Sequence, residues 1–347
     1  QDLGNLDQAL ASTLKSLELK GDNPGAVNNL KGFVQRLNLS ASNANNLTRA
    51  YELLLNQTDI SHRKLTTIFL QAFLPIIQKA SISDPIISGS NEALKVLASD
   101  WRFRKSLTLM VPPSSAAEGF FTRLRNELLN LAIQEGVIPR QVKSLTEALA
   151  AQCFLNEYVY TSSQEEDDSI AQLIESAAQN QEDTNRYLAI IGCYKAIYTT
   201  GISPEFINNY PTPDDSSKEL IIAQLNEPLQ EQEIKTSFQE KQNIDNTISQ
   251  KVQEMYEENP YPRWTNLGLS IEPRVIKDVI EDINLDVDLK KINFSKNPEI
   301  LIAGCGTGQH AITTASKYKN AEIFALDLSF NSLAYAKRKA EELNCKN

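Results

Sequence analysis

Residues 300–311 read ILIAGCGTGQHA, an apolar run that passes directly into a turn with three glycines. A continuous apolar run is typical of a short parallel strand that is buried on both faces. Glycine reaches backbone conformations that other residues avoid, and it lets a ligand approach the backbone closely. The stretch therefore predicts a strand over residues 299–303 and a ligand-binding turn that contains Gly304, Gly306 and Gly308.

The residues after this turn repeat the same pattern. Helical spacing follows the glycines, AEIFALDLS at 321–329 predicts a second strand, and a second helix begins after Ser329, which can cap it. The order strand, glycine turn, helix, strand, acid and helix is typical of half of a doubly wound nucleotide-binding domain. Asp327 stands at the tip of the second strand, where its carboxylate can accept both hydroxyl protons of a ribose.

The spacing of the glycines bears on which nucleotide is bound. The dinucleotide fingerprint requires a small residue three positions after its second glycine, and Gln309 occupies that position here. The third glycine is instead Gly308, which gives G-x-G-x-G. This tighter loop suits a ligand without phosphates, such as S-adenosylmethionine. A dinucleotide-dependent oxidoreductase remains the rival prediction, with Gln309 as the feature that argues against it.

Composition narrows the class of protein. The 347 residues are 41% hydrophobic, with a mean hydropathy of −0.33, which is ordinary for a soluble globular chain. A net charge of −10 argues against a broad nucleic-acid or anionic-membrane surface. The apolar stretch Leu65–Ile77 is too short to span a bilayer. The four cysteines form no C-x-x-C pair, so we expect no metal site and a reducing, cytoplasmic setting.

The beginning of the chain predicts a helical hairpin. Apolar residues recur at three- and four-residue steps to Leu19, GDNP at 21–24 ends the first helix, and Pro24 can begin the next. Residues 1–24 resemble the second half of a tetratricopeptide repeat. The matching residues are Leu3-Gly4, Ala9, Ala11, Leu17-Glu18-Leu19 and Asp22-Asn23-Pro24.

The middle of the chain predicts helices and no chemistry of its own. Residues 25–250 carry helical apolar spacing between clusters of Pro, Gly and Ser. The connector 251–270 contains MYEENPYPRWTNLG, in which two prolines enforce extended backbone. This connector is either packed between domains or a strap over a ligand, and we expect Trp264 to contact residues 300–347. A helix beginning near Pro273 is predicted to present Val275, Ile276, Val279, Ile280 and Ile283 on one face.

The motifs AGCGTGQH, ALDLS and SLAYAKRKAEEL resemble the first half of class I S-adenosylmethionine-dependent methyltransferases. With MYEENPYPRW ahead of the glycine turn, the chain is similar to bacterial methyltransferases fused behind tetratricopeptide repeats. AAQCFLNEYVY and LNEPLQEQEIKTSF extend this resemblance into the middle region. By resemblance, the turn glycines and Asp327 would bind the cofactor. Weaker candidates for cofactor or substrate contact are Ala303, Cys305, His310, Tyr261 and Arg263, of which His310 either faces the cofactor or caps and packs.

The resemblance implies a mainly α N-terminal region followed by the start of an α/β Rossmann-like methyltransferase domain over residues 271–347. A complete domain of this kind has more strands than the two predicted here, so we expect the chain to be an excerpt that is inactive alone. The implied reaction moves a methyl group to an unknown acceptor, with proteins among the candidates and protein partners bound by the helical region. No catalytic residue is assigned. A helical interaction scaffold with a degenerate nucleotide-binding domain is the other alternative.

Overall fold

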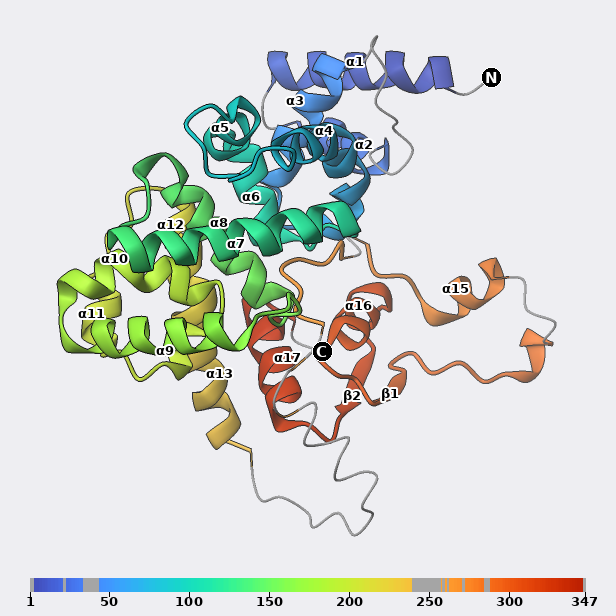
Figure 1. Ribbon diagram of the computed structural model, residues 1–347. Helices are drawn as coiled ribbons and strands as arrows, with labels where there is room; N and C mark the ends of the chain where they lie inside the picture. Colours follow the sequence, from blue (N-terminus) through green and yellow to red (C-terminus); the bar gives the residue numbers. More distant parts are fainter. Residues whose placement is uncertain are drawn as a thin grey trace. The chain divides into compact units, whose positions relative to one another are not determined.

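The computed structural model describes residues 3–20, 23–33, 44–238, 257, 260, 262–269, 272–283 and 288–345. Internal contacts divide the chain into two compact units, Gln1–Asn226 and Glu227–Asn347. We call them the helical unit and the C-terminal unit. The predicted fold class is confirmed, because the described part is mostly helical and carries a two-stranded parallel sheet near its C-terminal end (Figure 1).

The helical unit is a succession of helices. They are α1 (Leu3–Leu19), α2 (Pro24–Phe33), α3 (Ala44–Leu55), η1 (His62–Leu65), α4 (Thr66–Ala80), α5 (Glu92–Ser99), α6 (Trp101–Leu109), α7 (Ser115–Glu135), η2 (Arg140–Val142), α8 (Lys143–Leu155), α9 (Gln164–Gln179), α10 (Gln181–Gly192), η3 (Ile197–Thr199), α11 (Pro204–Asn208), α12 (Asp215–Ile221) and η4 (Ile222–Asn226). Pro24 begins α2, as predicted, and α1, α2 and α3 pack against one another.

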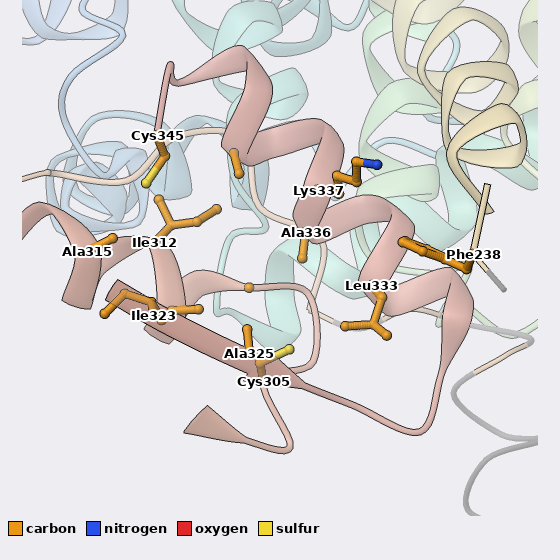
Figure 2. A pocket seen from close by; sticks show the side chains of 13 residues that line it. Phe238, Cys305, Ile312, Ala315, Ile323, Ala325, Leu333, Ala336, Lys337 and Cys345 are labelled. Atoms are coloured by element: carbon orange, nitrogen blue, oxygen red, sulfur yellow. The ribbon is translucent and has the colours of Figure 1, made fainter. Parts of the chain in front are cut away.

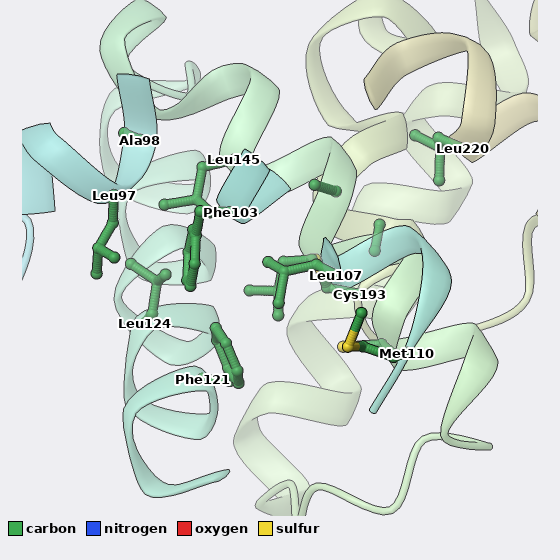
Figure 3. Packing of buried hydrophobic residues seen from close by; sticks show 14 of the residues in the cluster. Leu97, Ala98, Phe103, Leu107, Met110, Phe121, Leu124, Leu145, Cys193 and Leu220 are labelled. Carbon is green, nitrogen blue, oxygen red and sulfur yellow. The ribbon is translucent and has the colours of Figure 1, made fainter. Parts of the chain in front are cut away.

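One continuous apolar core fills the helical unit. Its centre is aromatic, with the Phe103 ring 5.2 Å from that of Phe73 and 5.8 Å from that of Phe69. Figure 3 shows Phe103 and Phe121 beside Leu107 and Leu124, side chains that α6 and α7 contribute. Because this core runs unbroken from α1 to η4, the unit's apolar periodicity is accounted for by packing.

The C-terminal unit contains α13 (Glu227–Thr236), α15 (Ile276–Asp282), η5 (Leu289–Lys291), β1 (Glu299–Ala303), α16 (Gln309–Lys317), β2 (Glu322–Leu326) and α17 (Phe330–Glu342). Strands β1 and β2 are parallel, with Ile300 opposite Ile323 and Ile302 opposite Ala325. Helix α16 is the crossover between them, as a parallel pair requires. The predicted order of strand, turn, helix, strand and helix is therefore present.

The two faces of this sheet differ in what covers them. Ile302 is buried in one cluster with Cys305 and Ala311, and Leu333 of α17 packs against that cluster. On the opposite face Leu301 is 64% exposed, Phe324 48% and Leu326 57%. Within the residues that the structure describes, helices thus cover one face of the sheet and leave the other open.

One helix of the predicted helical region 25–250 belongs by its contacts to the C-terminal unit. The sequence places the end of the helical region at residue 250, whereas the contacts assign α13 to the C-terminal unit. Helix α13 packs against α17, and the contact includes an ionic cluster in which Arg338 of α17 donates to Glu231 at 2.9 Å and pairs with Glu227 at 3.0 Å. Oppositely charged residues this far apart in sequence leave no local signal of their pairing.

Helix α15 also departs from its prediction. It begins at Ile276, with Val275 at the N-cap, and of the five apolar residues on its expected face only Val279 is buried. Val275 is 44% exposed and Ile283 54%. The apolar spacing correctly predicts a helix, but burial depends on a partner surface that spacing does not supply.

Candidate cofactor site

The glycine turn connects β1 to α16, and the structural requirement for glycine differs among its three glycines. Gly304, Gly306 and Gly308 have φ values of +70°, +53° and +83°, in the left-handed region that other residues rarely adopt. A Cβ on Gly308 would stand 2.6 Å from the Cβ of Ala336 in α17. A Cβ on Gly304 or Gly306 would meet nothing within 4 Å. Gly308 therefore permits close helix packing, while the other two border open space.

Hydrogen bonds tie this turn to the end of β2. The Cys305 N–H donates to the Leu326 carbonyl at 2.9 Å, and the Gly308 N–H donates to the Cys305 carbonyl at 3.0 Å. The Gly306 N–H donates to Oδ2 of Asp327 at 2.7 Å. The two strand ends thus meet through a charge-assisted hydrogen bond, which is among the stronger kinds in proteins.

Asp327 is fixed from both sides. Its Oδ1 accepts from the Ser329 N–H at 3.0 Å while Oδ2 accepts from Gly306. Ser329 in turn caps α17 by accepting from the Ser332 N–H, as the sequence predicts. Each carboxylate oxygen can accept more than one hydrogen bond. The carboxylate can therefore keep its hold on the turn while accepting from the hydroxyls of a ligand.

The segment 262–269, PRWTNLGL, packs against the glycine turn, and we call it the strap. The indole Nε1–H of Trp264 donates to the Thr307 carbonyl at 3.0 Å, and the Thr307 hydroxyl donates to the Pro262 carbonyl at 2.8 Å. Trp264 is only 6% exposed. The prediction that Trp264 contacts residues 300–347 is confirmed. The sequence did not single out Thr307, because a threonine between glycines carries no signal of its partner.

The weaker candidate residues lie in different surroundings. Arg263 is buried, with a guanidinium 3.6 Å from Glu231 and 5.5 Å from the centre of the Tyr335 ring. Its described partners are therefore on α13 and α17. Tyr261 lies outside the described residues. Ala303, at the end of β1, and His310, in the first turn of α16, are both exposed.

Cys305 is not an activated thiol in this structure. Its side chain is 8% exposed, and burial, together with the nearby carboxylate of Asp327, raises the pKa of its thiol to about 11. A thiol with such a pKa is protonated at neutral pH and is a weak nucleophile. Cys305 therefore contributes its backbone N–H and its small apolar side chain to the turn.

A small apolar cavity of about 290 Å³ lies under α16 and α17, along β2 (Figure 2). Ile312, Ile323, Ala325, Leu333 and Ala336 are among its lining residues. Of the predicted cofactor residues the lining includes Gly308 and the weaker candidate Cys305, but neither Gly304, Gly306 nor Asp327. The cavity is therefore a packing gap on the covered face of the sheet, distinct from the open space beside the first two glycines.

The described residues contain no group of three or more His, Cys, Asp and Glu side chains that could hold a metal ion. None of the helices in the described ranges is both long enough and apolar enough to cross a bilayer.

Comparison with known families agrees with this geometry. Residues 300–347 match the family model described as "Methyltransferase domain", a segment that includes the glycine turn, Asp327 and α17. No curated protein and no solved structure matches the chain. The match supports a methyltransferase domain in this part of the chain.

Proposed function

We propose that the protein is an S-adenosylmethionine-dependent methyltransferase and that the glycine turn and Asp327 form the cofactor site. The observation that carries the proposal is that the family match and the open glycine turn fall on the same residues. The methyltransferase-domain match covers the same residues in which an open glycine turn faces the carboxylate of the neighbouring strand. Neither feature alone would specify this cofactor, since glycine turns serve many nucleotides.

The residues present fit such a cofactor. Gly304 and Gly306 leave the space beside the turn free of side chains, so a ligand can lie against the backbone. Asp327, held at the carboxyl end of β2, would accept hydrogen bonds from the ribose hydroxyls. Both groups stand at the strand ends, where ligands bind in open α/β sheets.

The cofactor would supply an electrophilic methyl group on a positively charged sulfur. The protein's part in such a displacement is largely alignment of the acceptor with that methyl group. Asp327 and the turn would fix the nucleoside end. We assign no general base, and the acceptor stays open, with proteins among the candidates.

We further propose that the helical unit binds protein partners. The support is its resemblance to tetratricopeptide hairpins at residues 1–24 and the packing of α1, α2 and α3 against one another. Stacked helical hairpins commonly present extended binding surfaces. On this proposal the protein is of the bacterial kind in which such repeats precede the methyltransferase domain.

Residues 1–347 by themselves are proposed to lack turnover. The open face of the sheet exposes Leu301, Phe324 and Leu326, and apolar strand faces of parallel sheets are normally covered on both sides. Without such cover, the alignment of cofactor and acceptor on which the displacement rests would be poorly held. Label transferred from methyl-labelled S-adenosylmethionine by the isolated chain 1–347 would contradict this proposal.

The test of the function is a binding comparison on the natural full-length protein. S-adenosylmethionine and S-adenosylhomocysteine should each raise its melting temperature, and NAD should not, because a ligand that binds only the folded state stabilises it. Stabilisation by NAD alone would instead favour the oxidoreductase. An absence of any shift, confirmed by calorimetry, would favour the helical scaffold with a degenerate domain.

A further inference from the structure

Two hydrogen bonds join the strap and the glycine turn, and each segment donates one of them. Trp264 donates from the strap to the turn at 3.0 Å, and Thr307 donates from the turn to the strap at 2.8 Å. Thr307 is 2% exposed and its hydroxyl points away from solvent into this contact. A single crossing hydrogen bond could be incidental packing, but two that run in opposite directions fix both the distance and the orientation of the segments.

The strap is itself held by α17. The backbone N–H of Trp264 donates to the Tyr335 hydroxyl at 2.9 Å, and that hydroxyl donates to the backbone carbonyl of Trp264 at 2.5 Å. The ammonium of Lys339 lies 5.1 Å from the centre of the indole ring, and Tyr335 is 3% exposed. Contacts with α17 therefore fix the position of Trp264. Through its hydrogen bond to Thr307, Trp264 in turn restrains the glycine turn.

The turn needs such a support. Three of its five residues are glycines, and glycine has more backbone freedom to lose on ordering than any other residue. Thr307 stands between Gly306 and Gly308, so its two hydrogen-bonded groups restrain the most flexible part of the turn. The restraint favours the shape in which the Gly306 N–H reaches Asp327 at 2.7 Å.

We propose that Thr307 and Trp264 are positioning residues, which hold the glycine turn in its ligand-binding shape before the cofactor arrives. The inference rests on the proposed function. Neither side chain needs to touch the ligand. Their effect is to reduce the ordering that binding would otherwise require, which is the usual basis of preorganisation.

The experiment compares two substitutions at one position in the natural full-length protein. Thr307→Val keeps the shape of the side chain and removes the hydroxyl, whereas Thr307→Ser keeps the hydroxyl. Thr307→Val should weaken S-adenosylmethionine binding by about three- to tenfold, the range expected for one neutral hydrogen bond. Thr307→Ser should stay within about twofold of the wild type. Thr313→Val, at an exposed site on α16, is the matched control and should change nothing.

A second readout needs no ligand. Amide hydrogen exchange over residues 304–308 should quicken in Thr307→Val and in Trp264→Phe, which loses the indole N–H, but not in Thr307→Ser. Exchange in the helical unit should be unchanged in all three variants, which separates loosening of the turn from general destabilisation.

The outcomes distinguish the inference from the function on which it rests. If the wild type binds S-adenosylmethionine and the valine and serine variants bind equally well, with equal exchange over 304–308, the positioning role is wrong and the function stands. If the wild type does not bind, the proposed function fails and the positioning role toward this cofactor fails with it. Weaker binding and faster exchange in Thr307→Val, with neither change in Thr307→Ser, support the inference.

Discussion

The two units use buried polar groups in different ways. In the helical unit Arg125 is 1% exposed, and its guanidinium donates to the carbonyls of Tyr160, Thr161 and Cys193. In the C-terminal unit the polar contacts of the buried Trp264 and Thr307 and of the half-buried Asp327 converge on one turn that borders open space. Buried polar side chains therefore indicate a candidate site where their contacts surround accessible backbone, and not where they complete a core.

The largest expected effect concerns Arg125 and its role in the core of the helical unit. Arg125→Met should lower the free energy of unfolding of the helical unit by about 3 kcal/mol, because it removes the donor to the buried carbonyls of Tyr160 and Cys193. Arg123→Met, on the same helix but with a half-exposed guanidinium, should cost less than about 1 kcal/mol.

Denaturant titration followed by fluorescence measures both variants. Trp101 lies in the helical unit and Trp264 in the C-terminal unit, and the chain has two tryptophans. A Trp264→Phe background therefore makes Trp101 the only indole reporter. Equal costs for Arg123→Met and Arg125→Met would break the comparison, since Arg125 would then not be a core group.

The next largest effect separates the glycines of the turn. Gly308→Ala should destabilise the C-terminal unit by about 2–3 kcal/mol, because left-handed backbone strain adds to a clash with Ala336. Gly306→Ala should cost only the strain, about 1–2 kcal/mol, since its Cβ would meet open space.

Thermal unfolding followed by Trp264 fluorescence, in a Trp101→Phe background, compares these two variants. Gly306→Ala should weaken S-adenosylmethionine binding more than its loss of stability accounts for, because its new methyl group stands where the ligand would lie. A Gly308→Ala variant as stable as Gly306→Ala would show that the close contact between α16 and α17 is wrong.

A smaller effect concerns pH and the helical unit. Burial raises the pKa of Glu147 to about 7, although the Tyr210 hydroxyl donates to it at 2.7 Å and opposes the shift. Because the folded pKa lies above the unfolded one, the folded state binds this proton more tightly. Its contribution to stability is present below about pH 4.5 and is lost as the pH rises through about 7.

Glu147→Gln keeps an acceptor for Tyr210 and cannot ionise. The variant should match the wild type near pH 5 and exceed its unfolding free energy by about 1–2 kcal/mol near pH 8. Unfolding titrations at the two pH values, read from Trp101, measure the difference. A wild type whose helical unit is equally stable at both values would contradict the raised pKa.

Local patterns in the sequence predict local structure well. The run EILIA, the glycines, Asp327 and the Ser329 cap stand within 31 residues, and the predicted strand, turn and cap are all present. Pro24 likewise begins its helix. In each case the signal and the structure that it specifies lie within a few residues of each other. The predicted burial of the strand on both faces is wrong, because Leu301 is 64% exposed.

Features that depend on distant partners could not be predicted. The sequence explains the three turn glycines by ligand approach, yet Gly308 is required by Ala336 on the next helix. Trp264 is predicted to pack, but its bond to Thr307 spans 43 residues. The ion pair between α13 and α17 joins Glu231 to Arg338, which are 107 residues apart. Tertiary pairing of this kind leaves no periodic trace in a single sequence.

The most direct test of the central claim is calorimetry of S-adenosylmethionine binding to the natural full-length protein and its Asp327→Ala variant. Loss of a charge-assisted hydrogen bond to the ligand should weaken binding by about 10- to 150-fold, the equivalent of roughly 1.5–3 kcal/mol. The residues on either side of Asp327 are Leu326 and Leu328, so no adjacent carboxylate can take over its role. Affinity in Asp327→Ala equal to that of the wild type would contradict the assignment of the glycine turn and Asp327 as the cofactor site.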